Sequence, residues 1–347
     1  MADARTPSHR PRSSITLCII WMTVAGTLLA ACNQPQVSAT AQASLPPTSL
    51  SRAASIPTGA VKMQPSDDAW PPTVAPDWQP PVPLGAPIDT PGAEDSPFLT
   101  LDGRELYFFF TPDLNIPVER QIGDGVTGIW VSQRTPGAGW SEPTRVVLSD
   151  PGQVALDGCE FVLGEVMYFC SVRPGNLREV DLYTARRVNG TWQDWQNAGR
   201  QLNLDYTVGE MHITADGQTL YFGSSRPGGL GGRDLWSSTK TADGWSIPVN
   251  LGTAVNTGND EDRPYLSPDG QQLWFDGTSR QGRPGPSVFR SLRQADGSWG
   301  PPEEIVSTFA GEPTLSPDGR TLYFVHHFFS PDLKHMIEAD IFVTTRK

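Results

Sequence analysis

The sequence predicts an all-β protein built from five copies of one antiparallel unit. The string Asp-Gly-x-x-Leu-Tyr/Trp-Phe occurs at residues 102–108, 216–222, 269–275 and 318–324, and a shortened copy occupies residues 164–169. The aromatic residue before the Phe recurs at steps of 61, 53, 53 and 49 residues. Self-similarity at a nearly constant period indicates a repeat architecture. Apolar residues seldom recur at the helical period, which favours strands over helices within the repeats.

Each copy, here called a unit, contains the same four elements in order. A short strand precedes the Asp-Gly turn and a second follows it, because Gly accepts the positive φ of a tight hairpin. A loop then leads to a third strand, and a fourth begins with a Trp. First strands are expected at 97–100, 211–214, 264–267 and 313–316, third strands at 128–131, 181–184, 234–237, 287–290 and 340–343, and fourth strands from Trp140, Trp192 or Trp195, Trp245 and Trp299. Four short antiparallel strands describe a propeller blade.

The two ends of the repeat region predict how the blades close. The fifth unit ends at Lys347, just after its third strand, while residues 77–85 copy the fourth-strand segment 244–252. We therefore predict a five-bladed β-propeller over residues 76–347, closed by an N-terminal strand that completes the last blade. Such closure removes open sheet edges. The alternative is an open or split array of repeats.

Several strings resemble the WD40-like, TolB-type β-propeller repeat of bacterial envelope proteins. They are Ser-Pro-Asp-Gly-x-x-Leu-Tyr/Trp-Phe at 267–275 and 316–324, Ser-x-Arg-Pro-Gly-Gly…Asp-Leu-Trp at 224–236, and Trp-Ser-x-Pro-Val-Asn-Leu-Gly at 245–252. The resemblance extends over residues 77–347, and the second unit departs most from it. It implies the fold and very little chemistry, and TolB's own partners do not carry over, since its sixth blade and extra N-terminal domain are not expected here.

The first 31 residues read as a secretory signal peptide. Arg5, Arg10 and Arg12 precede an apolar stretch over residues 15–29, which is too short for a lasting membrane span. The following Leu-Ala-Ala-Cys string resembles the bacterial lipobox, which implies that Cys32 is lipidated. The alternative is an ordinary cleavage site with a chance cysteine. Because Asn33 is not the aspartate of inner-membrane retention, the resemblance favours the outer membrane, facing the periplasm.

Residues 32–75 are rich in Pro, Ala, Ser, Thr and Gln. Such a segment buries too little apolar surface to offset its ordering entropy, so we predict a disordered linker between the lipid anchor and the propeller. The formal charge of −12 argues against nucleic acid or an anionic membrane surface as a partner. The membrane is then contacted through the lipid anchor only.

Two cysteines remain in the predicted propeller. If Gly164 and Glu165 form a two-residue turn, Cys159 faces Cys170 across the hairpin. Opposed strand residues are close enough for a disulfide, and an envelope compartment is oxidising. We predict the bridge, with two free buried thiols as the alternative.

Charged residues recur at one predicted face of the propeller. Acidic residues stand just before the first strands, near the expected central channel, and arginines stand just after second strands. The candidate binding residues are Glu94, Asp95, Glu160, Glu210, Asp262 and Glu312, with Arg173, Arg226 and Arg280. The aspartates that open third strands, Asp181, Asp234 and Asp340, are expected to be structural, because a carboxylate there accepts hydrogen bonds from a turn.

Three interpretations of the acidic set stay open. The carboxylates bind a partner, or they cap amides and pair with arginines because the joint between blades repeats, or two of them catalyse glycoside hydrolysis. Repetition weighs against an enzyme, which needs an acid and a base in different environments, and no strong catalytic motif is present. The sequence thus favours a non-catalytic envelope scaffold that binds a protein or glycan. No cofactor is expected, apart from room for a divalent cation on the axis.

Overall fold

Within each unit, consecutive strands pair antiparallel in chain order. The computed structural model describes residues 51–135, 137 and 139–347. Unit one contains β3 (Ala93–Leu99), β4 (Glu105–Thr111) and β5 (Gly128–Thr135), with β6 (Gly139–Trp140) and β7 (Thr144–Arg145) both paired to β5. Unit two contains β8 (Leu156–Leu163), β9 (Val166–Val172), β10 (Asp181–Val188) and β11 (Thr191–Asn197).

The remaining units repeat this pattern. Unit three contains β12 (Met211–Ile213), β13 (Thr219–Ser224) and β14 (Asp234–Thr241), with β15 (Gly244–Trp245) and β16 (Val249–Asn250) paired to β14. Unit four contains β17 (Glu261–Leu266), β18 (Gln272–Thr278), β19 (Pro286–Leu292) and β20 (Glu303–Ser307), and unit five β21 (Ala310–Leu315), β22 (Thr321–Phe329) and β23 (Met336–Thr345). The described helices are short: α1 (Arg52–Ser55), η2 (Pro65–Asp67), α2 (Val118–Gln121) and η3 (Gln201–Asp205). None is long and apolar enough to cross a membrane.

The repeated string has a separate physical reason at each end. At the turn, Gly217 has a φ of 71°, and the carboxylate of Asp216 accepts hydrogen bonds from the backbone N–H of Gln218 and the hydroxyl of Thr214. At the other end, the Phe of every copy is fully buried. These residues are Phe108, Phe169, Phe222, Phe275 and Phe324. The string therefore combines a turn with a core anchor, which is why it recurs.

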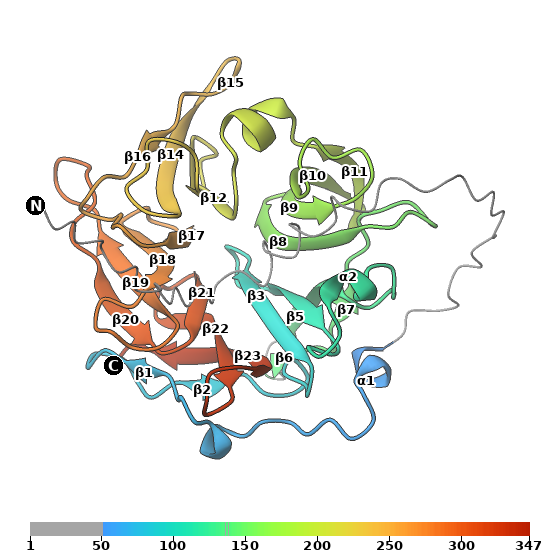
Figure 1. The fold of residues 1–347 in the computed structure, drawn as a ribbon. Coiled ribbons are helices and arrows are strands. Elements are labelled where there is room, and N and C mark those ends of the chain that lie inside the picture. The colour runs from blue at the N-terminus through green and yellow to red at the C-terminus, as the bar shows by residue number, and fades with distance from the viewer. Residues whose placement is uncertain (1–50, 136, 138) are drawn as a thin grey trace, which may run out of the picture. The chain divides into compact units, whose positions relative to one another are not determined.

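The sheets are arranged radially around a common centre, as Figure 1 shows. The first strands contact one another in chain order, β3 with β8, β8 with β12, β12 with β17 and β17 with β21, and β21 contacts β3. Antiparallel sheets arranged in this way form a β-propeller. The innermost strands place the residues before and within them near the axis.

The N-terminal segment pairs with the outer strands of units four and five. Strand β2 (Val82–Pro83) pairs antiparallel with β23, and β1 (Thr73–Val74) pairs with β20. Trp78 is 1% exposed and lies edge-to-face against Trp274, with ring centroids 5.7 Å apart. The indole anchors this segment on unit four.

The folded part of the chain begins earlier than the sequence predicts. The expected linker runs to residue 75, but Arg52 is buried and Thr73 pairs with Ser307. The composition of this segment offers little apolar surface for burial, but ion pairs from Arg52 and Lys62 to carboxylates of the propeller hold it in place. The signal peptide and Cys32 lie outside the described residues.

The predicted pairing of the two cysteines is wrong in register. The β8–β9 hairpin keeps the expected pairs up to Phe161 and Tyr168, then shifts, so that Gly158 faces Cys170. Cys159 occupies the bulge with a φ of 53°. Both cysteines are free thiols in this structure, and hydrogen bonding to Cys170 together with burial raises the pKa of Cys159 well above its ordinary value. The disulfide stays a prediction.

Candidate functional site

A cavity of about 50 Å³ lies where the first strands of all units converge. Consecutive residues from each unit line it. They are Ser96, Pro97 and Phe98, then Cys159, Glu160 and Phe161, then Glu210, Met211 and His212, then Arg263, Pro264 and Tyr265, and finally Glu312 and Pro313. We call this the axial site. Its lining is drawn from the same short stretch of every unit.

A β-bulge positions one residue of each of four units at the axial site. The register of β3, β8, β17 and β21 against its neighbour shifts there. The bulged residues Ser96, Cys159, Arg263 and Glu312 have φ values of 52°, 53°, 53° and 56°. Positive φ is uncommon outside glycine, and bulges re-aim side chains and occur near functional sites. The backbone is therefore bent at this level of the axis in each of these units.

The residues at the axial site differ from unit to unit. Where units one and two have Ser96 and Cys159, the equivalent residues of the others are Glu210, Arg263 and Glu312. At the next position, three units have Pro, unit three has Met211 and unit two has Glu160. If these side chains only stabilised the fold of each unit, the same residue would be expected in every unit. Because they differ, the fold of the unit does not require the side chains found on the axis.

Arg263 holds three carboxylates of the axial region. Its Nε lies 3.0 Å from Glu210 Oε1 and 2.7 Å from Glu312 Oε1, and its Nη1 lies 2.9 Å from Asp276 Oδ2. One guanidinium cannot neutralise three carboxylates, of which those of Asp276 and Glu312 are buried and that of Glu210 is half-buried. Burial therefore raises the pKa of Glu210 to about 7 and that of Asp276 to about 6, although Arg263 opposes the shift.

Glu160 is the axial carboxylate that Arg263 does not hold. It is 6% exposed, and neither of its carboxylate oxygens accepts a hydrogen bond from another described residue. Burial raises its pKa well above the ordinary value, and the charge of Glu210 adds to the shift. His212 supplies no charge, because burial lowers its pKa to about 3. Burying a carboxyl group without a hydrogen-bond partner lowers the stability of the fold. Glu160 is such a group, and it lines the axial cavity.

The other predicted acids, and Glu261 next to Asp262, do not line the axial cavity. Glu94 and Glu261 each accept hydrogen bonds from the N–H and hydroxyl of the Thr four residues before them, at 2.6–2.9 Å, which is a repeated turn. Asp262 pairs with Arg233, and Asp95 lies 3.6 Å from His327. Of the six predicted acids, only Glu160, Glu210 and Glu312 therefore line the axial cavity.

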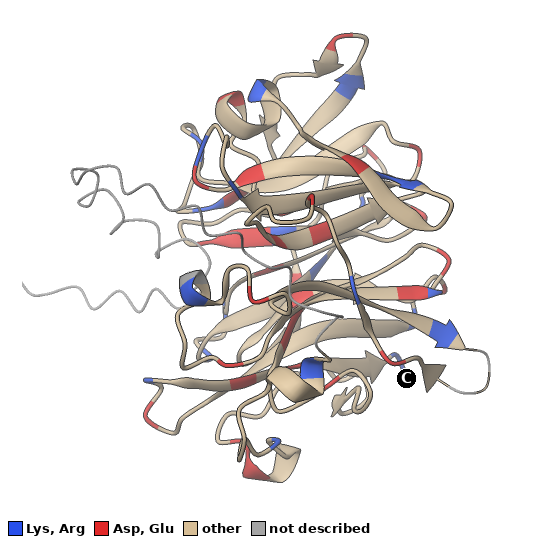
Figure 2. Cartoon of the chain, turned by 90° about the vertical axis from the view of Figure 1, so that its right-hand side faces the viewer, with Lys and Arg blue, Asp and Glu red and all other residues tan. Residues whose placement is uncertain are grey.

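The three predicted arginines stack on aromatic rings of third strands. The guanidinium carbons of Arg173, Arg226 and Arg280 lie 4.5, 4.8 and 4.9 Å from the ring centroids of Tyr183, Trp236 and Phe289. This contact recurs in three units and lies outside the cavity lining. Figure 2 shows acidic and basic residues on strands as well as in loops. The arginines thus serve the packing of the units.

Arg263, the central cation of the axial site, was not among the predicted site residues. The predicted pattern had acids before first strands and arginines after second strands, whereas Arg263 occupies the position of an acid. The signal was present in the alignment of units, where Arg263 stands opposite Glu210 and Glu312. The alignment does not show that the side chains of Arg263, Glu210 and Glu312 are in contact, because that depends on the β-bulge seen in the structure.

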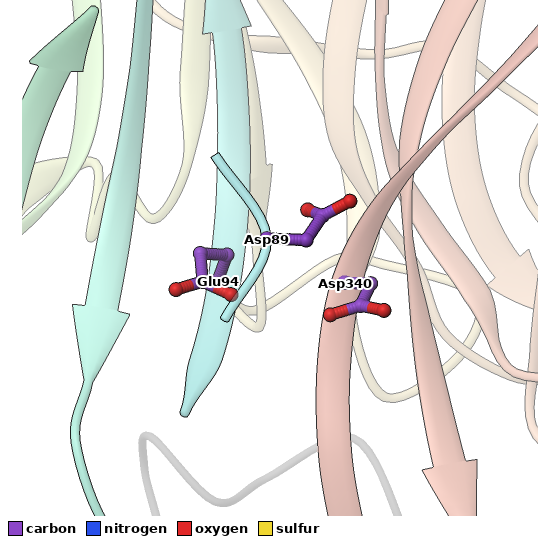
Figure 3. A group of neighbouring side chains, drawn as sticks. All are labelled: Asp89, Glu94 and Asp340. Carbon is purple, nitrogen blue, oxygen red and sulfur yellow. The ribbon is translucent and has the colours of Figure 1, made fainter. Parts of the chain in front are cut away.

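A second carboxylate cluster lies where the N-terminal segment meets units one and five. Asp89 precedes β3, Glu94 lies on β3 and Asp340 on β23, and Figure 3 shows the three side chains around one gap. Each is buried, and an oxygen of each lies within 4.8 Å of the others. Arg52 contacts Glu94, and Lys62 contacts Asp340. We call Asp89, Glu94 and Asp340 the junction cluster.

Comparison with known proteins shows similarity to solved β-propeller structures. A putative TolB from Agrobacterium tumefaciens is 18% identical over 71% of this chain and 73% of its own, with a TM-score of 0.39. TolB from Acinetobacter baumannii is 15% identical over 75% and 56%, with a TM-score of 0.43. An α-L-arabinofuranosidase from Lactobacillus brevis is 13% identical over 73% and 90%, with a TM-score of 0.44. No family model and no curated protein matches the chain.

Proposed function

We propose that this chain is a non-catalytic binding scaffold of the bacterial cell envelope, built on a five-bladed β-propeller. The five units are the blades, and β2 completes the last of them. The contacts that run from β3 through every first strand and back to β3 support this closure, as does the pairing of Val82 with Val343. The lipobox-like string at Cys32 supports an anchor in the outer membrane, with the propeller in the periplasm.

The observation that carries the proposed binding role is Glu160 at the axial site. A scaffold that only had to fold would place an apolar residue or Pro there, as units one, three, four and five do. Instead the axis has a buried carboxyl that no described side chain satisfies. A partner that supplies a donor or a positive charge offsets that cost. The partner is an envelope protein or glycan, bound at the face where the first strands begin.

The glycoside hydrolase alternative has less support. Its acid and base require room for a sugar between them, whereas small-molecule sites usually enclose about 300–1,000 Å³ and the axial cavity has about 50 Å³. Glu210 and Glu312 also share Arg263, so neither is set apart as a base. A binding role needs neither room nor unequal roles for these two residues.

The test is mild crosslinking of the lipidated protein in its native envelope, followed by capture and identification of what is bound. Glu160→Gln is the test variant, because it removes the charge without removing a partner of Arg263. Glu261→Gln is the matched control, a buried glutamate outside the axial cavity that accepts from the turn at Thr257 and lies 4.0 Å from Arg280. Both variants are checked for a wild-type circular dichroism spectrum.

The proposed function predicts a specific partner that the parent and Glu261→Gln capture and Glu160→Gln loses. Equal capture by all three proteins would remove the axial site from the binding surface. Release of reducing sugar from envelope glycans by the parent but not by Glu160→Gln would favour the hydrolase.

A further inference from the structure

The junction cluster breaks a hydrogen-bond pattern that units two and three share. In those units an Asn accepts from the backbone N–H after the aspartate that opens the third strand: Asn203 from Leu182 at 2.7 Å, and Asn256 from Leu235 at 2.8 Å. In unit five the same N–H, of Ile341, is accepted at 3.1 Å by Asp89. A carboxylate thus replaces an amide at an otherwise equivalent position.

The replacement removes donors from the site. Asn203 and Asn256 also donate their amide N–H to the carbonyls of Leu182 and Leu235, at 3.1 and 2.9 Å. An ionised Asp89 has no N–H to donate. The carboxylate lies beside Glu94 and Asp340 instead, each with an oxygen within 4.8 Å of the other two.

Asp340 has also lost the neutral donors of its counterparts. Asp234 accepts from the N–H groups of Leu230 and Gly231 and from the side chain of Asn250, at 2.6–3.0 Å. In unit five, Pro83 stands where Asn250 stands in unit three. The Oδ1 of Asp340 accepts no hydrogen bond from any described residue, although Asp340 is 1% exposed.

The charges at the junction do not balance. Lys62 pairs with Asp340 and with Glu338, and Arg52 pairs with Glu94, 3.0 Å away. Four carboxylates (Asp89, Glu94, Glu338 and Asp340) therefore stand against two cations, leaving two negative charges in a buried place. Burial and mutual repulsion raise the pKa of Asp89 and Glu94 to about 7 and that of Asp340 to about 8. Two protons or one divalent ion would restore the balance.

The geometry suits an ion. Calcium binds carboxylate and carbonyl oxygens at about 2.3–2.6 Å, so two oxygens on one ion lie at most about 5 Å apart. The three carboxylates of the junction cluster meet that limit; Asp89 and Glu94 come from β3 and the turn that leads into it, and Asp340 comes from β23 (Figure 3). The Oδ1 atom of Asp340 accepts no hydrogen bond from a described residue, so it is available as a ligand for the ion.

We propose that Asp89, Glu94 and Asp340 bind a divalent cation of the calcium type, and that the Lys62 ammonium competes with it for Asp340. The ion links the N-terminal segment, unit one and unit five. This site is separate from the axial site and does not depend on the proposed function.

The experiment is a calorimetric titration of the full lipidated chain, stripped with EDTA, with CaCl₂ and in parallel with MgCl₂ at pH 8. Thermal midpoints are recorded with and without each ion, since a ligand bound only by the folded state raises the midpoint. The key variant is Asp89→Asn, which restores the amide of units two and three and is therefore expected to fold. Asp181→Asn is the matched control, because it changes the buried aspartate of unit two that is equivalent to Asp340 and lies outside the junction cluster and the axial cavity.

The expected result is one calcium site whose affinity falls at least tenfold in Asp89→Asn and is unchanged in Asp181→Asn. Lys62→Met keeps the apolar stem without the charge, and we expect it to bind calcium more tightly than the parent. Absence of calcium binding by the parent would overturn the proposal. So would binding that survives Asp89→Asn, or a Lys62→Met protein that binds no more tightly than the parent.

Discussion

The axial site and the junction cluster contain buried carboxylates in similar number but neutralise them differently. At the axial site the cation is Arg263, which belongs to a first strand and contacts Glu210, Asp276 and Glu312. At the junction the cations are Arg52 and Lys62, which lie outside the repeats. The axis is thus organised by the propeller itself, whereas the junction depends on the N-terminal segment. Both sites keep carboxylate oxygens without a hydrogen-bond partner among the described residues: both oxygens of Glu160 and one of Glu312 at the axial site, and one of Asp340 at the junction.

Loss of Arg263 should have the largest effect on stability. Arg263→Met leaves the buried carboxylates of Asp276 and Glu312 and the half-buried one of Glu210 without a cation, and we expect the free energy of unfolding to fall by about 3–5 kcal/mol. Urea denaturation at pH 7.5 measures it. The control is Arg346→Met, whose side chain is 48% exposed and 3.6 Å from Asp77, and which should cost less than about 1 kcal/mol. Equal losses in the two variants would show that the axial cation has no special role.

Loss of Arg52 should have the next largest effect and should test whether the junction depends on the N-terminal segment. The guanidinium donates to the carbonyl of Ile88 at 2.7 Å and to Glu94. Arg52→Met should lower the free energy of unfolding by about 2–4 kcal/mol, because Glu94 is left buried and unpaired. Arg200→Met, at a 73% exposed side chain, is the control. An Arg52→Met protein as stable as the parent would mean that residues 51–63 do not hold the junction.

The pH dependence of stability should reveal the crowded carboxylates of the junction. The pKa of Asp89 in the folded protein is about 7, raised by burial and by Glu94, against 3.8 for the ordinary group. Its contribution is therefore fully present below about pH 4 and is lost as the pH rises through 7. In EDTA, Asp89→Asn should gain about 1–3 kcal/mol over the parent between pH 4 and pH 8, because Asn does not titrate.

Urea denaturation of both proteins at pH 4, 6 and 8 measures this gain. Asp181→Asn is the control, since that aspartate accepts from Leu177, Arg178 and Asn197. A constant difference between Asp89→Asn and the parent would contradict the expected crowding.

The smallest expected effect is at Glu160. Because burial raises the pKa of Glu160 and neither of its oxygens has a partner on another described residue to lose, Glu160→Gln should raise the free energy of unfolding at pH 7.5 by about 1 kcal/mol. Glu210→Gln, which removes a charge from Arg263, should cost more. The two variants are compared by thermal and urea denaturation at pH 7.5. A loss above about 2 kcal/mol in Glu160→Gln would show that this carboxyl has a structural partner.

The repeats made the strands predictable, because each string couples a turn to a core residue. The Asp-Gly turns and the buried Phe residues recur wherever the string does. Glu160, Glu210 and Glu312 were also predicted as candidates near the axis. Their separation from Glu94 and Asp262 was not predicted, because a shift of one residue decides whether a side chain reaches the axis.

The sequence by itself determined the all-β units, their strand order and the acidic character of the first strands. Those features follow from local periodicity and turn chemistry, which each unit contains within about fifty residues. Only the tertiary structure decided which charges meet. Arg263 reaches Glu210 from 53 residues away, and Lys62 reaches Asp340 from 278 residues away. Such contacts depend on bulges and on the pairing of segments far apart in the chain, which no local pattern records.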